Sequence, residues 1–439
     1  MTHRMHTSLR QRQAGAATLV VVMSLFLIVA MLAAFASRNM VYEQRIASNY
    51  YRTGVAYEAA EAGVEWALAM VNGDTVDATC QNSSAGTSLR DRYLRINQST
   101  RVVTKASTSE SAMLACFNNG ANSWACQCPT PHPTSASTFV IPAAVAGVGL
   151  QPTFSVGFKV GGRPGTARLT VSGCTGLNLN ECGNNFIAAA NSLSRVDRAV
   201  DIALVSALKM PPVSPLVARG TVSPGSPAAL GLFNTAPSGS GLLAQTGHAL
   251  AIADLAHAEG LPGSLASDHV IADDTTIRSQ AAELFFASFF GMNSDYYRGQ
   301  PKMRKIDVAA SCGGDCTVPL VDKLAAGGQM FWLDAPATFA ANVNLGGPTN
   351  PVVIIVNGDL TISEPIQIYG LLYVRGNLSW SNGSALPATV TGAVVVEGNV
   401  LASGTGAINM VYDATLMQIL NNQRGSFVRV PGSSWDQAR

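Results

Sequence analysis

Eight cysteines are the residues of this chain whose type and spacing most directly suggest chemistry. They form an even set outside the apolar N-terminal segment: Cys80, Cys116, Cys126, Cys128, Cys174, Cys182, Cys312 and Cys316. This usage is typical of an exported protein in which disulfides form. We expect one closed loop between Cys174 and Cys182 and another between Cys312 and Cys316. The other four cysteines allow three pairings.

A metal site is the alternative chemistry for part of this set. Cys126, Cys128 and His132 lie close together in the sequence. Zinc sites, however, favour two residues between paired cysteines rather than one. We therefore expect structural disulfides, with no metal and no other cofactor.

Acidic side chains are sparse in residues 352–412, which contain the internal repeat described below and would have to carry a carbohydrate-cleaving site. The charged residues there are Asp359, Glu364, Arg375 and Glu397, and no two adjacent copies of the repeat place acids at equivalent positions. Glycosidases use paired carboxylates. The chain also has no phosphate loop, nucleophile elbow or zinc-helix motif, so we do not expect an enzyme.

The N-terminal segment has the length and flanks of a membrane anchor. No charged residue occurs from Ala14 to Ser37, and a helix of this length would rise about 36 Å, enough to cross a bilayer core. Arg4, Arg10 and Arg12 precede the segment, so we expect a cytoplasmic N-terminus and export of everything after Arg38. Cleavage as a secretory signal is the rival interpretation, but the apolar run is too long for it.

A second helical pattern continues from Val41 to Asn72 without a proline. Apolar or small residues recur there at spacings of three and four, namely Tyr42, Ile46, Tyr50, Thr53, Tyr57, Ala60, Val64, Leu68 and Val71. Asn72-Gly73 supplies a stop signal. We expect one continuous helix from about Ala14 to Asn72, with the stripe beyond Tyr42 packed on a sheet.

Three motifs along this helix carry a resemblance to a known family. They are QAGAATL at Gln13–Leu19, EQRIASN at Glu43–Asn49 and AYEAAEAG at Ala56–Gly63. In combination they resemble the N-terminal region of PilX-type minor pilins of type IV pili, over about residues 10–70.

The resemblance implies a processing site and a departure from it. A prepilin peptidase would cut after Gly15, so that the mature chain begins at Ala16. Most pilins have glutamate at the fifth mature position, which is Val20 here. A subunit with no neighbour above it does not need that carboxylate, which is costly in a membrane without a partner. PilX-type proteins share this absence with the K-type minor pseudopilins of type II secretion, so the resemblance implies a place at the filament tip or in the initiation complex.

Charged residues on the rod are candidates for contacts between subunits. Arg38, Arg45 and Arg52 lie seven residues apart, so they share one helix face. The full candidate set is Arg38, Glu43, Arg45, Arg52, Glu58 and Glu61. A solvated helix face is the alternative interpretation of these charges.

The resemblance also implies partners and locations. Expected partners are the prepilin peptidase, the major pilin, other minor pilins and a PilY-type tip adhesin. The protein would reside in the inner membrane with its bulk in the periplasm, and then in an extracellular pilus. Nucleic acid is not expected, because charged residues are only 13% of the chain, the net charge is +1 and no basic cluster follows the leader.

The exported region divides into two parts. Residues 73–210 are rich in cysteine and contain alternating runs that begin at Thr138, Thr153, Ala167 and Arg198, as antiparallel strands with one covered face do. Prolines at 211, 212 and 215 mark a boundary. We therefore expect a leader at 1–15, a rod at 16–72, a pilin-like sheet domain at 73–210 and a second β domain at 211–439, giving an α+β protein.

The second domain contains an internal repeat. Three apolar runs are each followed by a glycine and an Asp or Asn, with the glycines at Gly358, Gly376 and Gly398. Spacings of 18 and 22 residues predict the stacked coils of a parallel β-helix, with the glycines at corners where positive φ is tolerated. An antiparallel meander remains the alternative topology. A helical insertion is expected near residues 279–290 and a helical cap at 414–421.

Three functions are compatible with these features. A minor pilin that primes or caps a type IV pilus fits the motifs best. A K-type minor pseudopilin of type II secretion is the nearest rival. A membrane-tethered β-helix that binds carbohydrate in the periplasm is the third, and it predicts no processing at Gly15.

Overall fold

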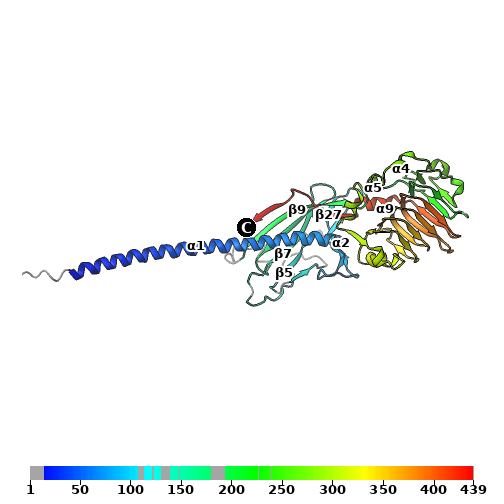
Figure 1. The fold of residues 1–439 in the computed structure, drawn as a ribbon. Helices are drawn as coiled ribbons and strands as arrows, with labels where there is room; N and C mark the ends of the chain where they lie inside the picture. The colour runs from blue at the N-terminus through cyan, green and yellow to red at the C-terminus, as the bar shows by residue number, and fades with distance from the viewer. Residues whose placement is uncertain are drawn as a thin grey trace, which may run out of the picture.

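A long helix, a sheet domain and a β-helix are arranged in that order along the molecule (Figure 1). The computed structural model describes residues 14–106, 113–120, 123–129, 139–147, 149–178, 193–225, 227–237 and 239–438. Below, the sheet domain that packs against the long helix is called the body. The expected α+β fold class is confirmed.

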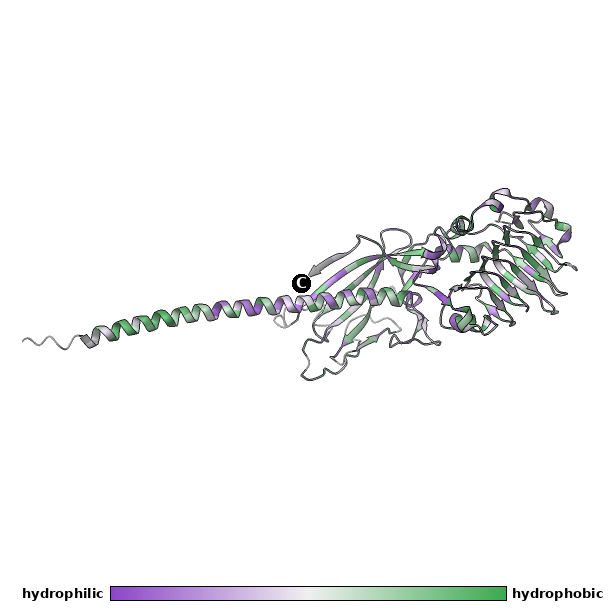
Figure 2. Ribbon diagram, in the orientation of Figure 1, coloured by the Kyte–Doolittle hydropathy of each residue, from purple (hydrophilic) through white to green (hydrophobic). Residues whose placement is uncertain are grey.

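The rod is one uninterrupted helix, α1 (Ala14–Val71), of 58 residues. Its end is held locally, since the Gly73 amide donates to the Met70 carbonyl (3.1 Å) and the Asn72 side chain donates to the Leu68 carbonyl (2.9 Å). Figure 2 shows that the first part of α1 is apolar and that polar residues follow it. The continuous helix predicted from the sequence is therefore present.

Only the last quarter of α1 packs on the sheet, which is less than the sequence predicted. Tyr42, Ile46 and Tyr50 are 51%, 54% and 76% exposed, and burial begins at Ala56. The sheet does not reach further along the rod. Where the sheet covers the helix, the two backbones lie in direct contact, because a Cβ on Gly173 would lie 2.2 Å from the Ala56 carbonyl oxygen.

The body is a seven-stranded antiparallel sheet in the order β27-β9-β8-β7-β5-β6, with β28 also on β9. Its strands are β5 (Met113–Asn118), β6 (Trp124–Gln127), β7 (Thr153–Val160), β8 (Thr166–Cys174), β9 (Arg195–Ser206), β27 (Gly425–Arg429) and β28 (Trp435–Ala438). Smaller elements flank it: β1 (Thr75–Val76), β2 (Thr87–Ser88), α2 (Leu89–Tyr93), β3 (Leu94–Ile96) and β4 (Val103–Lys105). Residues 139–141 do not form the strand expected there.

The expected boundary at 211–439 is wrong at its C-terminal end. After the β-helix the chain returns to the body, where β27 pairs with β9 and buries Phe427 in the core beside α1. The Asn72 side chain fixes this return, since its Oδ1 accepts from the Phe427 amide and its Nδ2 donates to the Phe427 carbonyl, both at 2.8 Å. The returning strand pairs with the edge of β9 that would otherwise be unpaired, and this pairing favours the return of the chain to the body.

The second domain is a parallel β-helix, as the repeat predicted. Val353 pairs in parallel with Leu371, and Leu371 with Ala393, so successive apolar runs stack directly. One series of stacked strands comprises β16 (Met303–Ile306), β17 (Met330–Leu333), β20 (Val352–Val356), β22 (Gln367–Val374) and β24 (Ala388–Val396). A second comprises β18 (Ala337–Phe339), β21 (Leu360–Ile362), β23 (Leu378–Ser381), β25 (Val400–Ser403) and β11 (Val222–Ser223). The meander is excluded.

The order of the coils differs from their order in the chain. β10 (Leu216–Ala218) pairs in parallel with the end of β24, and β12 (Leu230–Phe233) pairs with β26 (Ile408–Val411). The coils are continued by β13 (Ala244–Thr246), β14 (His257–Glu259) and β15 (Val270–Ile271), while β19 (Asn344–Leu345) pairs with β22. Coils that come first in the sequence therefore stack after the last repeat.

Helices cover one outer side of the β-helix. α5 (Ala282–Phe290), α6 (Ser294–Arg298) and α9 (Ala414–Asn422) contribute to an aromatic and aliphatic layer on the strands; its largest members are Phe285, Phe286, Phe290, Tyr297, Trp332 and Tyr373. β20 is consequently buried at every residue. The remaining helices among the described residues are α4 (Thr275–Ser279), α7 (Val308–Ser311), α8 (Thr317–Ala325) and the 3-10 turns η2 (Ile252–Asp254) and η3 (Ala266–His269).

The repeat glycines serve close packing more than positive φ. Of the three expected corners, Gly358 has φ 154°. Gly376 and Gly398 are not among the positive-φ glycines of the described residues, but a Cβ on either would approach the coil below within 2.6 Å. Their amides instead donate across the stack, Gly376 to Gly358 (2.9 Å) and Gly398 to Gly376 (3.0 Å).

Three disulfides are placed in the described residues. Cys80 joins Cys128 and Cys116 joins Cys126 in the body, and Cys312 joins Cys316 before α8. The metal alternative fails, because Cys126 and Cys128 belong to two different disulfides. Cys174 is also disulfide-bonded, and its expected partner Cys182 lies outside the described residues, as does His132.

Candidate assembly interface

The expected processing site lies at the start of α1. Gly15 is exposed in the first turn, and its carbonyl accepts a hydrogen bond from the Thr18 hydroxyl at 3.0 Å. Ala16 follows within the same helix. Residues 1–13, with the basic flank, lie outside the described residues.

The membrane-length part of α1 stands free of the rest of the molecule. In the part of the chain that the structure describes, α1 is the single helix long and apolar enough to cross a membrane, and its most apolar window is unburied. Val20, where most pilins have glutamate, is 64% exposed. This free apolar helix is compatible with a single-pass anchor.

A polar surface follows the apolar one on the rod. Gln44, Arg45, Ser48, Asn49 and Arg52 lie together along one helix face. These residues include the arginine and asparagine of the EQRIASN motif. The motif therefore presents a hydrogen-bonding surface outward, as an interface between subunits requires.

The other charged candidates on the exposed rod differ in their surroundings. Arg38 lies over the Tyr42 ring, 5.7 Å from its centroid. Glu43 and Glu58 are exposed. These side chains remain candidates for contact with other subunits.

Glu61, also expected at the filament surface, instead binds the body of its own chain. It forms a close ion pair with Arg198 of β9, and Arg429 of β27 lies 3.4 Å from it. Arg198 is only 6% exposed; it also donates to the Tyr57 hydroxyl (3.1 Å) and lies over that ring. Glu61 thus fastens the rod to the sheet, which sequence spacing could not show because both arginines are distant in the chain.

The β-helix is attached to the end of the rod by two cations beside β16. Lys302 Nζ donates to the Gly73 carbonyl at 2.7 Å. Arg304 donates to the Asn72 carbonyl at 3.1 Å and pairs with Asp74 at 2.6 Å. Cations at a helix C-terminus stabilise its unpaired carbonyls. Burial, followed by repulsion from Arg304 and Arg90, lowers the pKa of Lys302 to about 7.

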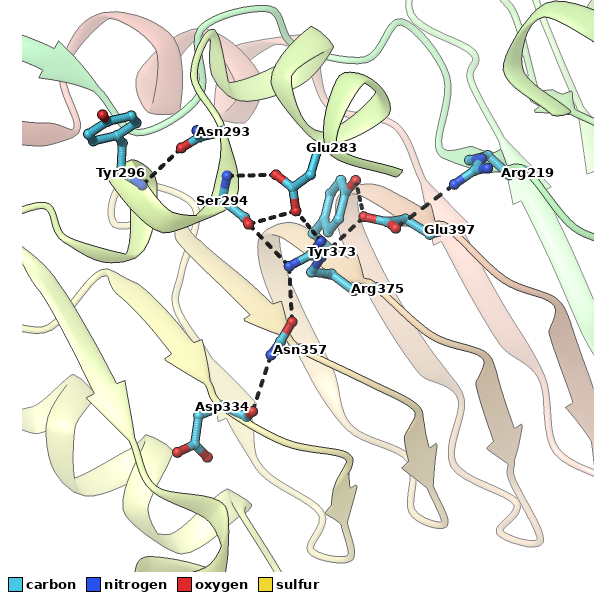
Figure 3. A network of polar contacts seen from close by, with 10 residues as sticks. All are labelled: Arg219, Glu283, Asn293, Ser294, Tyr296, Asp334, Asn357, Tyr373, Arg375 and Glu397. Carbon is cyan, nitrogen blue, oxygen red and sulfur yellow. Dashed lines mark hydrogen bonds and ion pairs between the residues drawn. The ribbon is translucent and has the colours of Figure 1, made fainter. Parts of the chain in front are cut away.

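The residue before each repeat glycine belongs to a polar ladder that the sequence analysis missed (Figure 3). Arg375 donates to the Asn357 side chain at 3.0 Å, and its Nε lies 3.4 Å from Glu397. Glu397 is in turn 3.9 Å from Arg219, on the coil that stacks next. The sequence signal that could have revealed this ladder is the residue directly before each repeat glycine, which is polar or charged in all three copies.

The ladder gives each carboxylate a partner. Glu283 of α5 pairs with Arg375 and accepts from the Ser294 amide and hydroxyl. Burial raises the pKa of Glu397, although a hydrogen bond from the Tyr373 hydroxyl (2.9 Å) and the arginines oppose that rise. A carboxylate pair for glycoside cleavage would need room for substrate between its members, but here Arg375 lies between Glu283 and Glu397. The network therefore fixes α5 and the coils to one another.

Comparison with known proteins finds a family match for the rod. Residues 14–65 match the PilX N-terminal family. Over these residues the rod is similar to the PilX N-terminal region. The resemblance carried by the three motifs is therefore confirmed, and it supports a type IV minor pilin in general terms.

Other comparisons add little. One solved structure, the competence-associated pilin ComZ from Thermus thermophilus, aligns over 88% of this chain and 98% of its own, with 9% identity and a TM-score of 0.24. No curated protein matches the chain.

Proposed function

We propose that this chain is a minor pilin that primes or caps the tip of a type IV pilus. A prepilin peptidase removes the leader after Gly15, the apolar half of α1 holds the protein in the inner membrane with its N-terminus cytoplasmic, and assembly then moves it into the extracellular fibre. Its partners are the major pilin, other minor pilins and a PilY-type adhesin. Its role is structural rather than catalytic.

The observation that carries the tip position is where the β-helix sits. It abuts the C-terminal end of α1 through Lys302 and Arg304, on the side away from the membrane segment (Figure 1). A subunit within the shaft has neighbours that continue along the rod direction, so a large module there would meet them. A tip subunit has no such neighbour.

Val20 supports the same position. An ionised carboxylate in a membrane is costly unless a partner meets it, and the amine of a subunit above would be that partner. Valine at this position therefore fits a subunit that has no neighbour above it. The exposed EQRIASN surface then faces subunits below.

Processing and location test the proposal. Mass spectrometry of membrane-extracted protein should find Ala16 as the first residue, and Gly15→Val should block this maturation. An intact leader would contradict a pilin and favour a tethered carbohydrate-binding β-helix.

Immunogold labelling then separates tip from shaft. We expect label at fibre ends or bases, and deletion should reduce the number of pili more than their length. Regular label along the shaft would contradict the tip position while leaving the pilin assignment intact. Loss of type II secretion with normal piliation would favour a K-type pseudopilin.

A further inference from the structure

A small polar pocket lies where the body meets the segment that leaves the β-helix. Arg90 and Asp91 of α2 and Arg95 of β3 form one wall, and Gln423 and Arg424, between α9 and β27, form the other. The pocket has a volume of about 130 Å³. Since one water needs only roughly 10–15 Å³ by this kind of measure, there is room for a small ion with its contacts.

Positive charge dominates this pocket. Among the described residues that line it, three are arginines and Asp91 is the one acid. Arg90 is 4% exposed and the Arg424 side chain 13%. The Arg424 Nη1 lies 3.8 Å from the Asp91 carboxylate, which is too far for a good hydrogen bond. One half-exposed carboxylate thus faces two buried guanidinium groups.

Arg424 also has an unfilled hydrogen-bond donor. Within the described part of the chain, the buried Arg424 Nε has no hydrogen-bond partner. The contacts that are formed use backbone carbonyls, Gly425 for Arg90 (3.2 Å) and Thr349 for Arg424 (3.1 Å), which bring no negative charge. A buried donor left unpaired costs free energy, so the site is chemically incomplete.

The positive charge of Arg424 also acts on Arg90. Burial, followed by repulsion from Arg424, lowers the pKa of Arg90 to about 10, so Arg90 remains charged at neutral pH. Burial alone would raise the pKa of Asp91, yet Arg90 and Arg424 bring it below its ordinary value. The charge of Arg90 also reaches Lys302 beside the β-helix, where it helps to lower the pKa of that amine.

We propose that this pocket binds a small tetrahedral oxyanion, such as phosphate or sulfate, which joins the body to the β-helix. Guanidinium groups present parallel N–H donors that match the oxygens of such ions. The bound ion contacts α2 on one side and the α9–β27 connection on the other, so it stiffens the junction that carries the distal domain. This inference does not depend on the tip assignment.

Phosphate binding to the full chain in detergent micelles tests the proposal. Inorganic phosphate should raise the unfolding temperature in a saturable manner, and more than chloride at the same ionic strength. Arg424→Gln should raise the dissociation constant for phosphate, measured by calorimetry, about tenfold or more, because a charge-assisted hydrogen bond is lost. Hydrogen exchange at residues 89–96 and 421–427 should slow in phosphate.

Two further variants keep the test decisive. Arg95→Gln removes a charge from the exposed rim, so it should also weaken phosphate binding even if Arg424→Gln folds poorly. Arg163→Gln removes an exposed arginine in the β7–β8 turn and should leave the affinity unchanged. Equal effects of phosphate and chloride, or equal effects of Arg95→Gln and Arg163→Gln, would overturn the proposal.

Discussion

The body and the β-helix are both rich in strands, yet they are stabilised in opposite ways. In the body, β9 alternates between buried and half-exposed residues, and single long-range contacts such as Glu61–Arg198 reinforce the packing of the sheet on α1. In the β-helix, β20 is buried throughout, and each coil pairs with the next through equivalent contacts. We therefore expect the loss of one such contact to destabilise the whole body. In the β-helix we expect the loss of one contact to have a local effect, because stability is shared among the coils as in other repeat architectures.

Disulfides give the largest expected contrast. Cys80–Cys128 spans 48 residues and Cys312–Cys316 spans 4. Loop entropy predicts that Cys80→Ser/Cys128→Ser lowers the free energy of unfolding by about 4 kcal/mol and Cys312→Ser/Cys316→Ser by about 2 kcal/mol. Urea unfolding of the two double variants measures this, and equal losses would contradict the contrast. Alkylation of the native protein should label few or none of the cysteines before reduction.

Loss of the ion pair between Glu61 and Arg198 should be the second most destabilising change in the body. Glu61→Ala leaves the buried Arg198 short of a carboxylate partner, so we expect a loss of about 1–3 kcal/mol, less than for a fully buried pair because Glu61 is 34% exposed. Glu58→Ala is the matched control on the exposed face, with an expected change below about 0.5 kcal/mol. Thermal unfolding compares them. Equal effects would mean that Glu61 does not fasten the rod.

Loss of one polar rung in the β-helix should have a smaller and local effect. Asn399 Oδ1 accepts from the Thr221 amide (2.8 Å) and hydroxyl (2.9 Å), joining the last repeat to the coil that stacks on it. Asn399→Ala should cost about 1 kcal/mol and speed hydrogen exchange at residues 216–223. The exposed Asn342→Ala serves as control. A global loss of stability would argue against distributed stabilisation.

The smallest effect is expected on the free half of α1, which neither domain covers. Val20→Glu should leave piliation unchanged or reduce it, because a lone carboxylate in the membrane costs several kcal/mol when no amine meets it. Fibre counts by electron microscopy measure this. A clear gain in fibre number would instead indicate a neighbour above this subunit.

Several features of the candidate interface could be predicted from the sequence because they are local. An uncharged run, a proline-free period of three to four and a glycine stop fix α1 wherever it lies. The apolar runs before Gly358, Gly376 and Gly398 likewise predict stacked coils, since each coil meets a neighbour with a similar apolar run. The CGGDC loop at Cys312–Cys316 is also local, and the structure joins those two cysteines.

Features that depend on distant segments could not be predicted from the sequence. Glu61 meets Arg198 and Arg429, and Asn72 meets Phe427, only because the chain returns to β9 after the β-helix. No period in the sequence marks such a return, because a five-residue strand such as β27 has no pattern of its own.

The sequence by itself therefore determined the rod, the family motifs along it and the repeated coil, each of which is specified by neighbouring residues. Tertiary structure alone decided that β10 stacks on β24, that only the residues from Ala56 onward pack on the sheet, and that the body closes with the C-terminal strands. The physical reason is the same in each case. Edge strands and buried charges are satisfied by whichever segment reaches them in space, and sequence distance does not limit that choice.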